Sequence, residues 1–181
     1  MLYIEPGAFF LCAFLLLMFP LKWVLGAILS ALIHELCHLV AVQLMGGKIS
    51  RICVGSGGTR IDGDLSDSKK ELLAILAGPA GSLFLAFLFR SIPELAVCGG
   101  IQGLYNLLPF WPLDGGRAVS LMWPEYAVRV ETVTYALLFL GGVYAFLRWK
   151  TGFWILLTML VLASGQISRK IPCKQGHFGV Q

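Results

Sequence analysis

The segment LIHELCHLVAV, residues 32–42, places two histidines and a glutamate in an otherwise apolar run. His34 and His38 are four residues apart, so on a helix their side chains project from one face, about 40° apart around the axis. Two imidazole nitrogens at this spacing suit one zinc ion. Glu35 lies about 80° from the line midway between them, where it can hold a metal-bound water without binding the metal. The pattern predicts hydrolysis in which zinc acidifies the water and the carboxylate accepts its proton.

The apolar surroundings of this motif strengthen the interpretation that it has a chemical role. In a soluble helix the HExxH pattern also occurs by chance. Within a membrane span, an ionisable side chain costs several kcal/mol, so three within five positions need compensating partners. A polar group that serves helix packing would account for one of the three. We therefore interpret the three residues as one chemical site.

A catalytic zinc site needs a third protein ligand and one open position. The remaining histidine, His177, lies in a polar tail, where we expect it to be solvated. Three aspartates, Asp62, Asp64 and Asp67, lie in a polar loop and are ordinary loop residues in this interpretation. Asp114 is the better candidate because it follows a long apolar segment.

Asp114 lies in the segment NLLPFWPLDGGR, residues 106–117. Pro109 and Pro112 break a helix there, and the two glycines that follow Asp114 permit unusual backbone angles. Broken backbone at membrane depth occurs only where it is buried in protein or lines a cavity. Taken alone, LDGG also fits an ordinary turn.

The composition places this site in a membrane protein. Hydrophobic residues make up 57% of the 181 residues and charged residues 13%, whereas soluble chains are about half apolar and a quarter charged. The chain is therefore predicted to be an all-α polytopic membrane protein with about six transmembrane helices. The first expected span has neither the basic start nor the cleavage site of a signal peptide. The six apolar segments, of which the first and fourth are marginal in length, are 3–19, 23–45, 71–90, 94–110, 131–147 and 151–168.

The basic residues predict the orientation of these spans. If the amino terminus is cytoplasmic, ten of the 14 Lys and Arg residues lie inside, in the 46–70 loop, the 111–130 loop and the tail after Ser168. This asymmetry favours both termini in the cytoplasm. The net charge of +4 then reflects topology, and we expect no nucleic-acid partner because basic runs with interleaved aromatics are missing.

The sequence indicates one domain without a soluble appendage. The longest connection between expected spans has about 25 residues, and 13 residues follow Ser168. The five cysteines contain no CxxC pair, which argues against a disulfide framework and a thiolate zinc site. We expect residues 1–181 to form a single membrane-embedded domain, with a catalytic core of about residues 23–117.

Together the two motifs resemble one family closely. HELCH in an early span, followed by N-x-x-P-x-x-P-L-D-G-G-R in a later one, resembles the site-2 protease family of intramembrane zinc metalloproteases (peptidase family M50). The likeness runs from about Gly26 to Arg117. The compact form is most similar to the branch that includes the sporulation sigma-factor-processing protease, which implies a bacterial cell membrane.

The resemblance implies a role for each matching residue. One zinc ion per chain would be bound by His34, His38 and Asp114, and Glu35 would be the general base. Asn106 matches the family asparagine that is thought to help hold the substrate backbone. The implied activity is regulated intramembrane proteolysis, hydrolysis of a peptide bond in a membrane-spanning or membrane-associated protein.

Two further segments fit the family, each with a duller alternative. AGPAGS, residues 77–82, resembles the family's AGP-x-x-N element, but it also fits a Gly-rich packing seam. ISRICVGSGGTRID, residues 49–62, predicts two short strands around a Gly-rich turn. In the family, such β-structure is thought to accept the substrate as an added strand; the alternative is a plain surface hairpin.

The sequence also departs from the family pattern. Cys37 replaces the glycine that is usual in HELGH, and its side chain points about 80° from the histidine face on the side opposite Glu35, so we do not expect it to bind zinc. Ser82 stands where the family often has asparagine. No PDZ domain separates the two motifs. Selectivity would then come from a prior cut in the substrate, from a regulatory membrane protein, or from the strand-like segment.

Two other classes of membrane protein carry some of these features. A catalytically silent scaffold that binds client helices would keep the fold. Such a protein would be expected to have lost at least one residue of the site, whereas this chain has all four, His34, Glu35, His38 and Asp114. A transporter or metal-ion carrier also uses ionisable groups within its spans. Such a carrier should distribute them along several spans, whereas here they cluster at one depth and no inverted repeat is evident.

Overall fold

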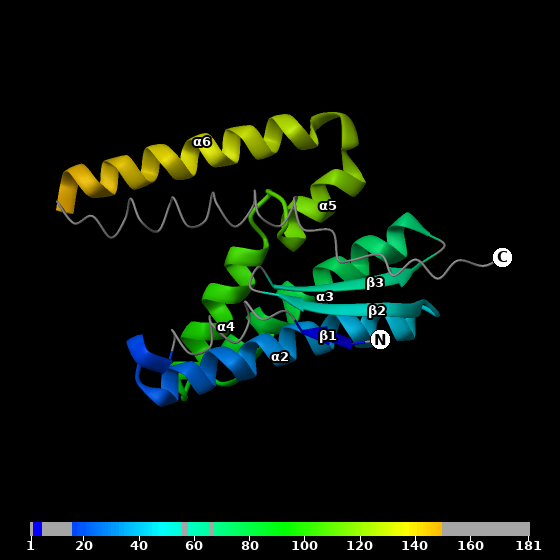
Figure 1. Ribbon diagram of the computed structural model, residues 1–181, viewed down its shortest axis with the longest axis horizontal. Coiled ribbons are helices and arrows are strands. Elements are labelled where there is room, and N and C mark those ends of the chain that lie inside the picture. Colours follow the sequence, from blue (N-terminus) through cyan, green and yellow to red (C-terminus); the bar gives the residue numbers. More distant parts are fainter. Residues whose placement is uncertain (1, 5–15, 56–57, 66, 150–181) are drawn as a thin grey trace.

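The computed structural model describes residues 2–4, 16–55, 58–65 and 67–149 (Figure 1). These residues form five helices and three short strands. In chain order they are β1 (Leu2–Ile4), α2 (Leu21–Leu44), β2 (Lys48–Gly55), β3 (Gly58–Asp64), α3 (Ser68–Leu88), α4 (Pro93–Asn106), α5 (Asp114–Met122) and α6 (Pro124–Trp149).

The helices α2, α3 and α4 pack against one another and form the centre of the described structure. Glycines allow their backbones to approach closely. A Cβ atom on Gly26 of α2 would lie 3.0 Å from the carbonyl oxygen of Glu94, at the start of α4. A Cβ atom on Gly99 of α4 would lie 2.9 Å from the carbonyl oxygen of Ser82 on α3. Small residues at such crossings are typical of helices that associate in a membrane.

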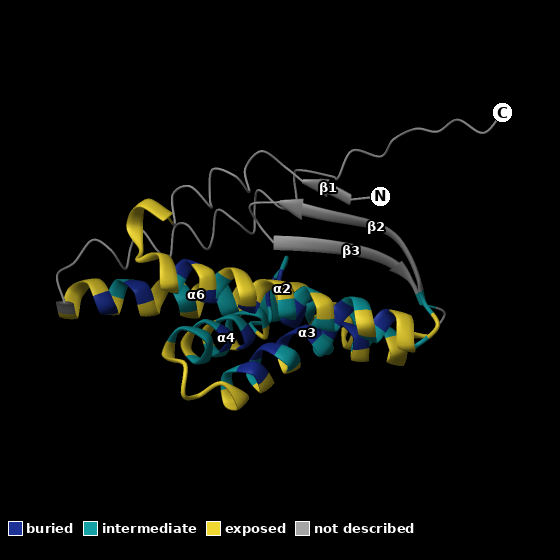
Figure 2. Cartoon of the chain, turned by 90° about the horizontal axis from the view of Figure 1, so that it is seen from below, coloured by how far each residue is buried: buried dark blue, intermediate teal, exposed yellow. Residues whose placement is uncertain are grey.

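Three helices of the described residues are long and apolar enough to cross a membrane, namely α2, α3 and α6. Their exposed faces carry large apolar side chains, whereas Ser30, His34 and His38 of α2 are buried. Figure 2 shows exposed and buried positions alternating along these helices. On α2, Leu25 and Leu32 are 55% and 62% exposed, whereas Ser30 and His34 are buried. This inverted pattern is expected where lipid is the solvent. The structure therefore supports an integral membrane protein.

The predicted spans correspond to these helices to different degrees. The segments 23–45 and 71–90 form α2 and α3, and the segment 131–147 lies within α6. The segment 94–110 forms α4, which has only 14 residues and is about 21 Å long at 1.5 Å per residue. Alone it is too short for a hydrocarbon core of about 30 Å. The remaining two segments, 3–19 and 151–168, lie largely or wholly outside the described residues.

The amino-terminal prediction needs a correction at its start. Tyr3 and Ile4 belong to the strand β1 and do not begin a helix. Strand β1 pairs in parallel with β2, so that Leu2 lies opposite Ile52. This pairing satisfies backbone groups that a helix would otherwise satisfy internally. It also joins segments about 50 residues apart, which local sequence patterns do not reveal.

The strands form one three-stranded sheet in the order β1-β2-β3. β2 and β3 are antiparallel, with Gly55 opposite Gly58, and an irregularity interrupts their register between Ile49 and Arg51. Both β2 and β3 contact α2. An all-α description of the fold therefore omits this sheet, in which β2 is the central strand.

The helical structure is interrupted between α4 and α5. The helix α4 ends at Asn106, and α5 begins at Asp114. Between them, Phe110 is fully buried, and the Tyr135 hydroxyl of α6 donates a hydrogen bond to the Trp111 carbonyl at 3.1 Å. On the other side of the turn, a Cβ atom on Gly115 would overlap the Leu107 carbonyl. The predicted break in the helical structure is thus observed. A hydrogen bond from α6 and close packing against α5 hold the turn in place.

Candidate metal centre

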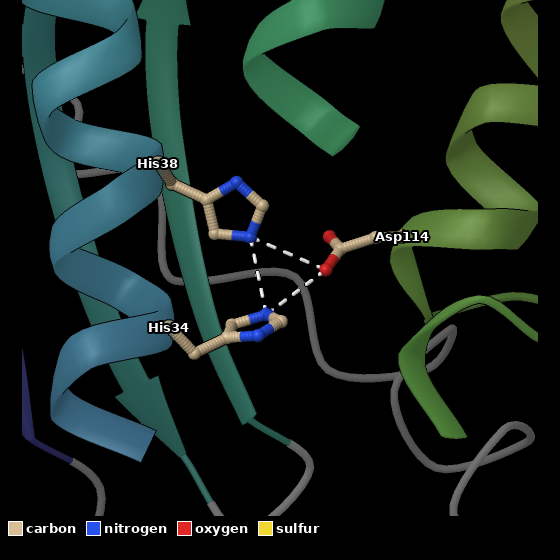
Figure 3. A group of neighbouring side chains, drawn as sticks. All are labelled: His34, His38 and Asp114. Carbon is tan, nitrogen blue, oxygen red and sulfur yellow. Dashed lines mark hydrogen bonds and ion pairs between the residues drawn. The ribbon is translucent and has the colours of Figure 1, made fainter. Parts of the chain in front are cut away.

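Three side chains from two helices converge inside the helical layer. His34 and His38 project from one face of α2 toward Asp114 at the start of α5 (Figure 3). The Nε2 atoms of the two histidines are 3.2 Å apart. The Oδ2 atom of Asp114 is 3.1 Å from Nε2 of His34 and 3.2 Å from Nε2 of His38. The three atoms therefore form a nearly equilateral triangle. All three residues are buried, so this triangle is shielded from solvent.

This triangle has the dimensions of one face of a zinc site. Zinc binds imidazole nitrogen and carboxylate oxygen at about 2.0–2.1 Å, so neighbouring ligands of a tetrahedral site are about 3.3–3.4 Å apart. The observed separations of 3.1–3.2 Å are close to this value. The donor set of two imidazoles and one carboxylate also suits zinc, and three ligands leave a fourth position open. The residues present therefore fit a catalytic zinc ion.

Helix α3 holds the far side of both imidazole rings. The Nδ1 atom of His38 donates a hydrogen bond to the Ala74 carbonyl at 2.8 Å. Because a carbonyl can only accept, this bond places the proton on Nδ1 and leaves a lone pair on Nε2. The Nδ1 atom of His34 is 2.9 Å from the hydroxyl oxygen of Ser82. Both rings thus direct Nε2 toward Asp114, as histidines that bind metal commonly do.

The start of α5 positions the carboxylate. Asp114 is 7% exposed, and its second oxygen, Oδ1, is 3.8 Å from Nη1 of Arg117, one turn further along the helix. A Cβ atom on Gly116 would overlap the backbone of Phe110 in the preceding turn. Only a residue without a side chain allows this close approach. The two glycines after Asp114 therefore let α5 begin directly against the turn.

Two further predicted site residues lie outside the triangle. Glu35 is half-buried on α2, next to His34 in the chain. Asn106 is the last residue of α4, and its Nδ2 atom donates to the Gln102 carbonyl at 3.1 Å. Among the described residues, Glu35 does not belong to the group that could hold a metal ion.

Two of the residues that we did not expect to bind metal, Asp67 and Cys37, are described by the structure and lie outside this group. Asp67 is the amino-terminal cap of α3, where its carboxylate accepts from the Lys69 amide at 3.0 Å. Cys37 lies against Gly81 of α3, and its thiol is not part of the group. The structure does not describe the side chains of Asp62 and Asp64, or any part of His177.

The small-residue segment 77–82 contacts the histidines of the site, so it does more than let two helices pack closely. Gly78 lies against the ring of His38, and Ser82 contacts the ring of His34. Sequence reasoning missed Ser82 as a partner of His34 and the Ala74 carbonyl as a partner of His38. The available signal was the spacing of Ala74, Gly78 and Ser82, which places all three on one face of a helix.

Comparison with known proteins points to one family. Residues 8–96 match the family model described as Peptidase M50B-like, and this region contains the HExxH motif. This match and the relatives below support placing the chain in the M50 peptidase family. It is 32% identical over 135 residues to the putative zinc metalloprotease Rip3 of Mycobacterium tuberculosis, covering 60% of this chain and 34% of that protein. It is 28% identical over 138 residues to stage IV sporulation protein FB of Bacillus subtilis, covering 68% of this chain and 48% of that one. The chain thus spans a third to a half of these M50 relatives.

A solved structure has the same fold. The site-2 protease from Methanocaldococcus jannaschii superimposes on 98% of this chain and 94% of its own, with a TM-score of 0.69 and 18% sequence identity. At this identity the likeness concerns the fold. The likeness in fold covers 98% of the chain, whereas the family model matches only residues 8–96.

Proposed function

We propose that this chain is an intramembrane zinc metalloprotease that hydrolyses peptide bonds of membrane-spanning or membrane-associated proteins. The observation that supports it most is the buried triangle of His34 Nε2, His38 Nε2 and Asp114 Oδ2, with edges of 3.1–3.2 Å. Buried ionisable groups are costly among helices that face lipid, so three of them at one point indicate a function. The match to the M50B-like family model and the likeness to a zinc metalloprotease add independent support.

The three residues of the triangle would hold one zinc ion per chain. Zinc in this position would act as a Lewis acid toward the scissile carbonyl and would make a nearby water molecule more acidic. Asp114 would offset part of the metal's positive charge, and the two imidazoles would direct lone pairs on Nε2 at the metal, since their Nδ1 atoms face α3. The ligands thus fix the orientation of the site before a substrate enters.

Glu35 is proposed as the general base. It follows His34 directly on α2, and its half-buried side chain flanks the ligand face of that helix. In this position its carboxylate can take a proton from the attacking water and pass it to the departing amine. Water would reach the site along a polar route, for which the cytoplasmic ends of α2 and α4 are the nearest source.

Asn106 and the sheet are proposed to bind the substrate backbone. Asn106 is the last residue of α4, directly before the turn that leads to Asp114. The strand β2 already pairs with β1 on one side and with β3 on the other over residues 52–54. Within the described residues, the sheet has two outer edges, one on β1 with 3 residues and one on β3 with 7 residues. A substrate strand is proposed to add to the longer edge, that of β3.

The proposed setting is a bacterial cell membrane, with about six spans and both termini in the cytoplasm. Residues 1–181 would form one membrane-embedded domain, and residues 23–117 its catalytic core. The relative named for sporulation supports placing the chain near that branch. The substrate would be another membrane protein, and a regulatory membrane protein is proposed to control access.

The decisive experiment reconstitutes the full chain in liposomes with a single-span protein substrate and compares the wild type with Glu35→Gln. The proposal predicts cleavage by the wild type that a metal chelator abolishes and zinc restores, and no cleavage by the variant. A silent scaffold would bind the substrate without cutting it in either case. A metal-ion carrier would move zinc across the bilayer instead, which a zinc-sensitive dye inside the liposomes would detect.

A further inference from the structure

Ser82 of α3 occupies a position that packing alone does not explain. Its side chain is completely buried, with 0% exposure, and its hydroxyl oxygen is 2.9 Å from Nδ1 of His34. The opposite nitrogen of the same ring, Nε2, lies 3.1 Å from the Asp114 carboxylate. Ser82 is therefore in contact with a residue of the metal centre while remaining outside the triangle of ligand atoms itself.

The hydroxyl group can decide the state of this ring. A neutral imidazole has one N–H group, and the other nitrogen carries a lone pair. When the hydroxyl accepts a hydrogen bond from Nδ1, the lone pair lies on Nε2, on the side where Asp114 and His38 meet (Figure 3). His38 is fixed in the same way by the Ala74 carbonyl, which also belongs to α3. One helix thus orients both rings, once through its backbone and once through a side chain.

We propose that Ser82 is a positioning residue of the metal centre, whose hydroxyl holds the His34 ring with Nε2 free to bind a divalent metal ion. This inference rests on the proposed function. It assigns a role to a residue at which the chain departs from the family's usual asparagine. Outer partners of metal-binding histidines typically change metal affinity about 10- to 100-fold when they are removed.

The chain offers a matched control for this role. Ser30 of α2 is also completely buried, with 0% exposure, and its hydroxyl donates a hydrogen bond to Oε1 of Gln102 on α4 at 2.7 Å. Ser30 and Ser82 are thus two buried serines that each link a pair of packed helices. They differ in that only Ser82 contacts a histidine of the centre.

The test compares zinc affinity in the wild-type full chain, Ser82→Ala and Ser30→Ala, each purified in the same detergent and depleted of metal. Zinc affinity is measured by competition with a chromophoric chelator, and the visible spectrum of bound Co²⁺ reports ligand geometry. Thermal unfolding of the metal-free proteins shows how much each change loosens the helices. We expect Ser82→Ala to bind zinc about 10- to 100-fold more weakly than the wild type, with an altered cobalt spectrum. Ser30→Ala should lower the unfolding temperature to a similar extent and leave both metal readouts unchanged.

Two results would overturn the inference. Zinc affinity and a cobalt spectrum equal to those of the wild type in Ser82→Ala would show that the hydroxyl does not act on the metal centre. An equal loss of affinity in Ser30→Ala would show that general loosening of the helices accounts for the effect. A wild-type chain that binds no zinc would instead overturn the proposed function itself, and this inference with it.

Discussion

Gly78 of α3 lies directly against the imidazole ring of His38 on α2. A Cβ atom built on Gly78 would overlap Nε2 of that ring, the same atom that is 3.2 Å from the Asp114 carboxylate. The ring is held in this place from its other side, because its Nδ1 atom donates to the Ala74 carbonyl. A side chain at Gly78 and a correctly placed His38 ring therefore exclude each other.

The first prediction follows from this contact. Gly78→Ala should reduce zinc affinity by at least about 100-fold, because its methyl group requires the space of the coordinating nitrogen and misplaces a ligand. Zinc titration of the metal-free protein measures this loss. The matched control is Gly100→Ala on α4, where a Cβ atom meets its nearest neighbour at an ordinary 3.9 Å. Equal zinc affinity in both variants would mean that the His38 ring moves freely and that the described contact is unimportant.

The second prediction concerns Glu35. Glu35→Gln keeps the size of the side chain and removes its basicity, so cleavage should fall by about 10²–10⁴-fold, the usual contribution of a general base. Zinc content and helix content should remain those of the wild type, because Glu35 lies outside the ligand triangle. Cleavage rates in liposomes and elemental analysis provide the two readouts. Substantial turnover by the variant would require a different base.

The third prediction concerns Cys37, which stands between the two histidines in the HELCH motif. Its thiol lies against Gly81 of α3 and is not among the converging ligand atoms. Cys37→Ala should therefore keep zinc affinity and cleavage close to wild-type values. Alanine is chosen because glycine would cost about 1 kcal/mol within a helix. If zinc affinity collapses in this variant, the thiol binds the metal and the three-residue site is wrong.

The sequence was sufficient to predict that His34, His38 and Asp114 meet in one candidate metal centre, for two physical reasons. The i, i+4 spacing of His34 and His38 fixes a shared helix face regardless of tertiary structure. Asp114 stood out because prolines and glycines interrupt an apolar segment beside it, and the structure has the predicted break between α4 and α5. Both signals are local, which is why the residues could be found before their neighbours were known.

The features that sequence reasoning missed depend on contacts between distant segments. Ser82 became a partner of His34 through the register of α3 against α2, and a single sequence does not reveal this register. Strand β1 pairs with β2 over about 50 intervening residues, and its three residues had been expected to be largely helical. The hydropathy pattern also predicted a longer helix than α4, because the apolar run of residues 94–110 continues into the turn that follows Asn106.

The fourth prediction concerns the substrate. A stable helix has no free backbone donors or acceptors for strand addition or for the metal centre, so it must unwind before it is cut. Gly or Pro placed near the scissile bond should therefore raise the cleavage rate relative to a matched substrate with Ala or Leu there. The comparison uses protein reconstituted alone. Equal rates for both substrates would remove support for strand addition and would point to a required partner protein.

A proline substitution in β2 would be a poor test of whether the substrate adds to the sheet as a strand. The residues Ile52 and Val54 pair with β1 on one side and β3 on the other, so proline at either position would disrupt the chain's own sheet. Such a variant would lose activity whether or not a substrate adds as a strand. Varying the substrate leaves the sheet intact.

The central claim is that His34, His38 and Asp114 together bind zinc. The most direct test is the zinc content per chain, by elemental analysis, of the wild type, Asp114→Ala and Asp67→Ala. Both substitutions remove one carboxylate, but Asp67 caps α3 at its exposed start, away from the histidines. We predict about one zinc per chain in the wild type and in Asp67→Ala, and almost none in Asp114→Ala. A wild type without zinc, or full zinc content in Asp114→Ala, would contradict the account.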